Sequence, residues 1–427
     1  MKQWDLERRS KLLVVAAIVG AAVPLNAGGI AMDPRSGAVV QAQGQEVRVA
    51  PAFGASPNRT FRTPGYFAPR MFRNGVVFGE QAPGADTDSV AVVYDLAGKK
   101  LFECANLYTA SLTPDGSALV TAHNPLGDEQ QTWEFLAREA RKSQLPMPRK
   151  DAFIVRSCKL QPLACEFDFY GPELFGLEDG GSLTAAAGVA HRDAVLAIAP
   201  GVVARVKEGK LVWRTEVVDT LSHTPEVWDL RPEWDALLLG SDHSGDLWLL
   251  DLSTGEIRGR WVPTGDAKLA AALFPQGLEK AVSKSCWWSS EEGKAPVPAS
   301  YLEHIQSSGK EVFLKAELIH VWMAKIVDGT KALAVIGGFP SYTPIASRGA
   351  LECPMPYRMV AVDLRTGTAL TVRPVSELFP EALRTHPSFD PRNYPRPQIA
   401  TGAGNIVLCM HQSSNDRCTV VSQQALR

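Results

Sequence analysis

The sequence lacks the linear motifs of several common enzyme classes. It contains no Gly-x-Ser-x-Gly nucleophile elbow, no His-Glu-x-x-His zinc helix, no Walker loop and no Gly-x-Gly-x-x-Gly dinucleotide fingerprint. The usual signatures of serine hydrolases, zinc proteases, nucleotide-hydrolysing enzymes and dinucleotide-dependent enzymes are therefore missing. Only sites assembled from residues far apart in the sequence, which leave no linear motif, stay open.

Charge of one sign and long apolar runs are also scarce. The 44 Lys and Arg balance 46 Asp and Glu, and no basic block occurs, which argues against nucleic acid as a partner. The longest notable apolar run, 12–25, is shorter than the roughly 20 residues that span a bilayer. With 45% hydrophobic residues among 427, the chain can bury a sizeable core, so a disordered or collagen-like protein is excluded.

The N-terminus has the pattern of a secretory signal. Residues 1–11 carry four basic side chains, the apolar run 12–25 follows directly, and Ala27 offers a small-residue cleavage point. We therefore predict a signal peptide over 1–27 and a mature domain over 28–427, without a transmembrane span after cleavage. Two alternatives stay open, namely an uncleaved anchor and an N-terminus whose Trp4-Asp5 belongs to a β-strand.

The seven cysteines show no Cys-x-x-Cys spacing, so zinc ribbons, thioredoxin chemistry and attached c-type haem have no support. Cys158 and Cys165, and likewise Cys409 and Cys418, bracket short segments that could turn between two antiparallel strands. Each pair could therefore face its partner across a hairpin as a disulfide, which normally persists in an exported protein. Buried free thiols are the alternative, and the odd total leaves at least one cysteine unpaired.

A short unit recurs along the chain. An apolar strand ends in Asp, a Gly-containing turn follows, and a second strand begins, at 92–102, 247–257 and 359–369. The spacings of 156 residues from Asp95 to Asp251 and 112 from Asp251 to Asp363 suggest three and two units of roughly 52 to 56 residues. Weaker hairpins that fill the pattern are expected at 153–167, 202–215, 309–318 and 405–421.

These units resemble the blades of WD-repeat-like and quinoprotein-like β-propellers, which have four strands and often close with Asp and a Thr-Gly turn. The Gly-His pair of true WD repeats is missing, and the unit at Asp95 lacks the Thr. The resemblance implies an all-β fold with a single propeller. Seven blades are favoured from hairpins near Asp95, Lys159, Glu208, Asp251, Gly309, Asp363 and His411, and an eighth is possible at 30–51. Because an open edge would expose backbone groups, segment 30–49 is expected to close the ring.

Three stretches interrupt the repeats. Apolar residues at helical spacing predict a short helical insert over Asp128–Gln144, ended by Leu145-Pro146. The stretches Ser289–Ser300 and Gly337–Pro356 are rich in Pro, Gly and Ser, and we interpret them as loops on one face of the ring.

Candidate ligand residues are few. His243 is interpreted as a surface turn residue rather than a base or metal ligand. Asp86 and Asp88 lack the further acidic positions of a calcium loop and are interpreted as solvated. Trp287 and Trp288 should face opposite sides of a strand, one in the core and one exposed, rather than form a sugar-stacking platform. No metal site or cofactor is indicated.

Two classes of function remain. We favour an exported, non-catalytic propeller that binds a protein or a surface polymer through its loop face. The alternative is a propeller enzyme of lactonase or quinone-cofactor type, which would require acidic, His or Arg side chains converging at the channel mouth with a bound ion or cofactor. An intracellular scaffold remains a third interpretation if the N-terminus is a blade strand.

Overall fold

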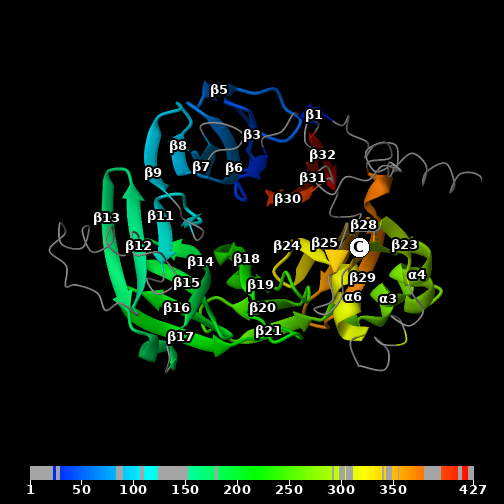
Figure 1. Cartoon of the computed structure of the whole chain (residues 1–427). Helices are drawn as coiled ribbons and strands as arrows, with labels where there is room; N and C mark the ends of the chain where they lie inside the picture. The colour runs from blue at the N-terminus through cyan, green and yellow to red at the C-terminus, as the bar shows by residue number, and fades with distance from the viewer. Residues whose placement is uncertain are drawn as a thin grey trace, which may run out of the picture.

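Seven four-stranded antiparallel sheets follow one another around a central channel (Figure 1). The computed structural model describes residues 23–25, 29–82, 90–105, 110–123, 152–177, 181–290, 293–297, 303, 311–338, 341–342, 349–353, 355–378, 396–411 and 416–421. Neighbouring inner strands contact one another around the ring, and the first of them contacts the last. The chain is therefore a seven-bladed β-propeller, as the repeats predict.

Each blade consists of four strands that follow one another from the channel outward. Blade 1 has β2 (Ile30–Met32), β3 (Val39–Gln43), β4 (Glu46–Ala50) and β5 (Arg59–Arg62); blade 2 has β6 (Tyr66–Arg73), β7 (Val76–Ala82), β8 (Val90–Asp95) and β9 (Lys100–Ala105); blade 3 has β10 (Ala110–Leu112), β11 (Ala118–His123), β12 (Phe153–Leu160) and β13 (Leu163–Tyr170); blade 4 has β14 (Ser182–Ala190), β15 (Asp193–Ala199), β16 (Val202–Lys207) and β17 (Lys210–Glu216). Blade 5 has β18 (Glu226–Arg231), β19 (Ala236–Gly240), β20 (Leu247–Asp251) and β21 (Ile257–Trp261); blade 6 has β24 (Val321–Ile326), β25 (Lys331–Gly338), β28 (Met355–Asp363) and β29 (Thr368–Pro374); blade 7 has β30 (Arg396–Gly402), β31 (Asn405–His411), β32 (Asp416–Val421) and β1 (Val23–Leu25).

The repeated Asp and Gly shape the outer hairpins. The Asp251 carboxylate accepts a hydrogen bond from the Ser253 N–H at 2.9 Å, and Gly255 turns the chain at a φ of 75°, which Gly adopts without steric cost. Asp95 and Asp363 accept from the N–H groups of their own turns in the same way. Since each hairpin is specified by contiguous residues, its position could be predicted from the sequence.

The middle strands of the blades form the core. All of Ala194–Ile198 in β15 and Ala236–Leu239 in β19 are buried, because neighbouring blades cover both faces of each sheet. Such strands read as continuous apolar runs rather than as an alternation of apolar and polar residues.

The ring is closed by a different strand from the one expected. Segment 30–49 supplies β2, β3 and most of β4, which are the three inner strands of blade 1, in place of a closing strand or an optional eighth blade. The outer strand of blade 7 is instead β1, which pairs antiparallel with β32 from Val23 opposite Cys418 to Leu25 opposite Asp416. The closing strand therefore lies inside the predicted signal peptide.

The hairpin predicted near Gly309 is wrong. Its described part is helix α6 (Glu311–Ile319), and only one blade boundary separates Asp251 from Asp363. The extra residues between these aspartates form helices α3 (Ala267–Leu273), α4 (Leu278–Ser285) and α6, and part of an additional sheet. The number of blades is nevertheless seven, because blade 1 takes the place of the unit expected at Gly309.

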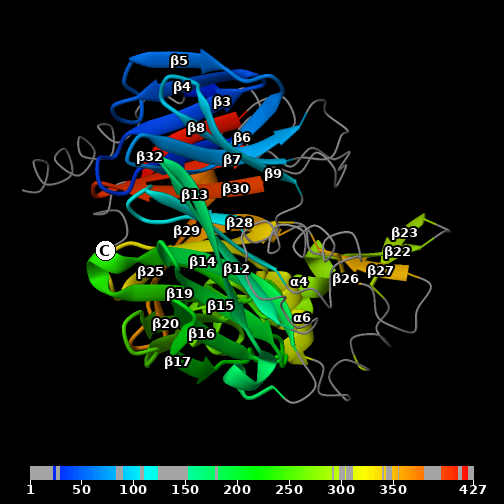
Figure 2. The ribbon, with the colours of Figure 1, turned by 90° about the vertical axis from the view of Figure 1, so that its left-hand side faces the viewer.

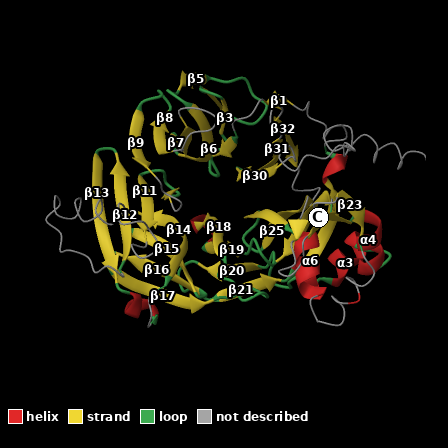
Figure 3. Ribbon diagram, viewed as in Figure 1, coloured by secondary structure: helices red, strands yellow, loops and turns green. Residues whose placement is uncertain are grey.

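The two stretches predicted as loops contain strands of that additional sheet. β22 (Trp287–Ser290) and β23 (Gly293–Pro296) pair with β26 (Ser341–Tyr342) and β27 (Gly349–Glu352) in the order β23-β22-β27-β26. We call these four strands the accessory sheet. It projects from the ring (Figure 2), and α3, α4 and α6 gather on the same side of the molecule (Figure 3). The predicted insert Asp128–Gln144 lies outside the described residues.

The structure contains three disulfides. Cys158–Cys165 and Cys409–Cys418 each join directly opposite positions of two paired strands, the arrangement expected from their spacing. The third, Cys286–Cys353, does not follow from the hairpin spacings, and it ties the start of β22 to the end of β27.

Asp266 joins the accessory helices to the ring. One of its carboxylate oxygens caps α3 by accepting from the N–H groups of Lys268 and Leu269, and the other accepts from the Trp261 indole and the Ala369 N–H, at 2.6–3.0 Å. The side chain is buried, so its removal leaves these donors without a partner.

We expect Asp266→Ala to lower the free energy of unfolding by about 2–4 kcal/mol, because it removes a helix cap and two buried hydrogen bonds. Chemical denaturation measures the loss. Asp266→Asn keeps one acceptor oxygen, so its free energy of unfolding should lie between those of Asp266→Ala and the native chain. Equal stability of Asp266→Ala and the native chain would contradict this role.

Candidate functional site

The inner strands of all seven blades line a cavity of about 370 Å3 in the channel. Each blade contributes at least one side chain to its wall: Met32, Arg73, Ser111, Ala186, Arg231, Lys325 and Ile399 are one such set. The cavity is within the usual range for a small-molecule site. No linear motif marks it because its residues come from seven separate segments.

Three cations gather where the inner strands end. Arg73 is the last residue of β6, Arg231 is the last of β18, and Lys325 is next to last in β24. We call these three side chains the channel cations. Asp229 lies among them, with its carboxylate 3.0 Å from the Arg231 guanidinium and 3.8 Å from the Lys325 ammonium.

Hydrogen bonds fix this cluster. Asp229 also accepts from the Ile326 N–H at 3.0 Å, which links blade 5 to blade 6. Lys325 donates to the Trp228 carbonyl at 2.6 Å, and Arg231 donates to the Thr401 hydroxyl of blade 7. Arg231 and Asp229 are both buried, so this part of the cluster is rigid and largely shielded from water.

The charges of the cluster are unevenly paired, because no carboxylate of the described residues forms an ion pair with Arg73. Burial lowers the pKa of Arg73 and of Lys325, and the positive charge of Arg231 lowers both further. Burial alone would raise the pKa of Asp229, but Arg231 and Lys325 lower it overall, which keeps the carboxylate ionised. Asp229 is the carboxylate that pairs with both Arg231 and Lys325. Glu233 lies 3.6 Å from Arg231 and is 45% exposed, and the buried Asp33 attracts Arg73 from a greater distance.

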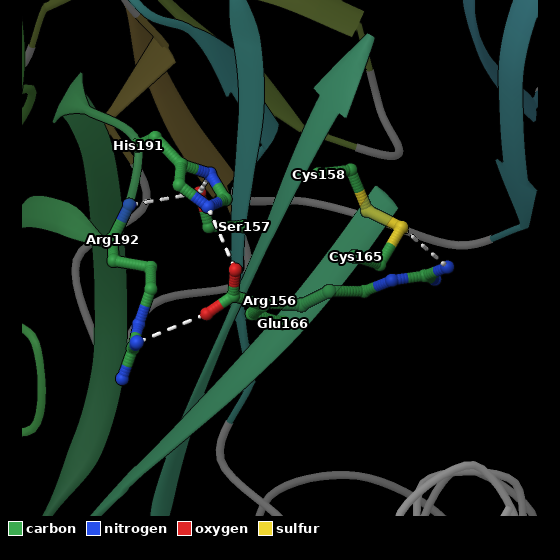
Figure 4. Close-up of a disulfide and its surroundings, with 7 residues drawn as sticks. All are labelled: Arg156, Ser157, Cys158, Cys165, Glu166, His191 and Arg192. Carbon is green, nitrogen blue, oxygen red and sulfur yellow. Dashed lines mark hydrogen bonds and ion pairs between the residues drawn. A yellow bond between two sulfur atoms is a disulfide. The ribbon is translucent and has the colours of Figure 1, made fainter. Parts of the chain in front are cut away.

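A second polar cluster joins blade 3 to blade 4 beside the Cys158–Cys165 disulfide (Figure 4). Ser157 lies 2.9 Å from His191 Nδ1, and His191 Nε2 lies 3.3 Å from Glu166. The Ser157 hydroxyl also accepts a hydrogen bond from the Arg192 N–H at 2.9 Å. The hydrogen bond from His191 is the main reason that the pKa of Glu166 is lowered.

The Ser157 cluster has the residue types of a catalytic triad, but its serine is inaccessible. Ser157 is 0% exposed, and its oxygen is occupied by the Arg192 N–H. We interpret the cluster as a contact between blades.

A fluorophosphonate probe should therefore leave Ser157 unlabelled in the folded protein, as mass spectrometry of the labelled protein can show. Ser157→Ala should instead cost about 1–3 kcal/mol of stability, because the Arg192 N–H loses its partner. Labelling of Ser157 in the native protein would contradict a purely structural role.

The predicted candidates His243, Trp287 and Trp288 do not line the cavity that holds the channel cations. His243 lies in the turn before β20 and is exposed, and its ring stacks on His223 with centroids 4.1 Å apart. Trp287 and Trp288 are both half-buried, and Trp288 packs against the core between blades 5 and 6. The prediction that one of the two rings lies in the core and the other is exposed is therefore wrong. Asp86 and Asp88 lie outside the described residues.

Within the described ranges, no three His, Cys, Asp or Glu side chains are placed to hold a metal ion. The described helices also include none that is long and apolar enough to cross a membrane.

No family model matches the sequence, and no curated protein matches it. Two solved structures are similar over most of the chain. "KlHsv2 with loop 6CD replaced by a Gly-Ser linker" has 7% identity and a TM-score of 0.47, with 91% of this chain and 90% of that chain covered. "Crystal Structure of Mitotic Checkpoint Complex" has 8% identity and a TM-score of 0.44, with 93% and 90% covered. The resemblance to WD-repeat-like propellers holds at the level of fold, in the seven four-stranded blades.

Proposed function

We propose that this chain is an exported, non-catalytic β-propeller that binds a protein partner through its accessory sheet. The accessory sheet is the main observation behind the proposal. The seven blades form the ring without it, so the sheet is available for binding. Within the described residues, the insertion adds two edge strands, the helices α3, α4 and α6, and a disulfide on one side of the molecule.

The edges of the accessory sheet suit recognition of an extended segment. β23 pairs only with β22, and β26 pairs only with β27, among the strands that the structure describes. An edge strand presents N–H and C=O groups to a partner strand, and its side chains give selectivity. Cys286–Cys353 and the packing of α3, α4 and α6 against blades 5 and 6 hold the sheet in place.

Three disulfides support export, because such bonds persist in oxidising compartments. The signal pattern over 1–27 points the same way. Cleavage near Ala27 during export would remove β1 and leave β32 as the outer strand of a three-stranded blade 7.

Affinity capture of host envelope proteins tests the binding role. Ala295→Arg places a bulky charge on the exposed edge strand β23, and Val212→Arg does the same on the outer strand β17 of blade 4, where Val212 is 47% exposed. We expect one partner to bind the native chain and Val212→Arg alike and to be lost from Ala295→Arg. Binding that Ala295→Arg leaves intact, or retention of an envelope polymer with no protein, would contradict the proposal.

A further inference from the structure

The channel cations create a site that partner binding at the accessory sheet does not use. We propose that this end of the channel binds a small molecule through a carboxylate or phosphate group. The argument rests on Arg73, which forms no ion pair among the described residues, on the cavity beside it and on the rigidity of its surroundings.

Arg73 is the central residue of this proposal. Its guanidinium donates to the main-chain carbonyls of Phe72 and Met32 at 3.0 and 3.3 Å, and no carboxylate of the described residues forms an ion pair with it. Asp33 attracts it from a greater distance, but that carboxylate already accepts three main-chain N–H groups. A guanidinium has five N–H donors, so further donors remain for a ligand. Placing this cation near Arg231 without a paired anion is unfavourable, and a bound oxyanion would remove the repulsion.

The three cations differ in what they can offer. Arg231 is committed to Asp229 and Thr401, and it fixes the geometry. Lys325 is more exposed to the cavity than Arg231, at 27% against 5% of the side chain, and its ammonium is only 3.8 Å from Asp229. Arg73 and Lys325 are therefore the two groups that would contact the anion. Arg231 would add its positive charge without contacting the ligand.

Size and shape favour a small ligand. A cavity of about 370 Å3 accommodates a molecule of a few carbon atoms bearing one or more oxyanions, but not a folded segment. Guanidinium and ammonium groups recognise carboxylate and phosphate oxygens by the same charge-assisted hydrogen bonds. The cations of the cavity therefore suit either a carboxylate or a phosphate.

Arg70 provides a matched control. It lines the same cavity from the same strand as Arg73, but it is 59% exposed and already paired with Glu80 at 2.6 Å. Its removal lowers the net charge as much as removal of Arg73 does, without taking away an uncompensated cation.

Calorimetric titration with inorganic phosphate and, separately, with citrate tests the site, with chloride balancing the ionic strength. We expect at least one of them to bind the native chain at a single site and raise its melting temperature. Arg73→Gln and Lys325→Met should weaken binding about tenfold or more, and Arg70→Gln by less than about twofold. Phosphate binding without citrate binding would assign a phosphorylated ligand, and the reverse a carboxylic acid.

Stability without ligand separates a binding role from a folding role. Arg73→Gln removes a repelled cation, so its melting temperature in chloride should equal or exceed that of the native chain while its response to the anion is lost. Lys325→Arg keeps the charge and should retain binding. The proposal is overturned if neither anion binds better than chloride, or if Arg70→Gln weakens binding as much as Arg73→Gln does.

Discussion

Asp229→Asn should lower the free energy of unfolding by about 3–5 kcal/mol, since removing one partner of a buried ion pair leaves the others uncompensated. Asp229 is buried and pairs with both Arg231 and Lys325, and it also accepts from the Ile326 N–H of the next blade. Chemical denaturation at neutral pH measures the loss. Asp242→Asn is the control, because Asp242 is 62% exposed and pairs only with His243 at 3.5 Å, so it should cost less than about 0.5 kcal/mol.

The effect of Asp229 should depend on pH with a defined sign. Its pKa in the folded protein is below the unfolded value of about 3.9, so its stabilisation is complete above that pH and declines as the pH falls toward the folded pKa. The difference between the native chain and Asp229→Asn should therefore be constant from neutral pH to about pH 5 and shrink in more acidic solution. A difference that grows on acidification would contradict the ion pair.

Loss of Cys286–Cys353 should destabilise the protein more than loss of either hairpin disulfide. It links residues 67 apart in the sequence, whereas Cys158–Cys165 links residues 7 apart. The entropy of closing these loops in the unfolded chain gives about 4 kcal/mol for the first and about 2 kcal/mol for the second. Paired Cys-to-Ala variants compared by denaturation midpoints test this ranking.

The two disulfide variants should also differ in where they open. Without Cys286–Cys353, limited proteolysis should cleave first around the accessory sheet, while the blades remain protected. Without Cys158–Cys165, the accessory sheet should keep its native protection. Equal losses of stability, or cleavage that begins in blade 3 in both variants, would contradict the proposed role of Cys286–Cys353.

The outer hairpins can be located from the sequence because each is specified locally. Asp251 and Gly255 lie four residues apart and determine one turn between them. The predicted blade number is also right, but through two compensating errors, at Gly309 and at segment 30–51. The turn between the outer strands of blade 1, residues 51–58, contains neither Asp nor a Thr-Gly pair, so the repeat pattern indicates this blade only as an optional one.

The accessory sheet could not be predicted from local patterns. Its strands 287–296 and 341–352 are separated by α6 and the first two strands of blade 6, and their pairing is non-local. Pro, Gly and Ser in these stretches favour loops by composition, and only tertiary pairing makes them strands. A cysteine in each stretch or beside it, Cys286 and Cys353, was the one available signal.

The channel cations escaped detection for a related reason. Arg73, Arg231 and Lys325 lie in three different blades, and no spacing along the chain connects them. An alignment of the seven blades would show a charged residue at the end of the inner strand in several of them. That pattern is the signal that indicates these three cations.

The central claim, an exported propeller stabilised by three disulfides, is tested most directly by the intact mass of the protein from its own host, before and after reduction. The account predicts a chain that begins near Gly28 and gains about 6 Da on reduction, two hydrogens for each disulfide. A chain that keeps residues 1–27 and shows no mass change on reduction would contradict it, and would make β1 a permanent strand of blade 7.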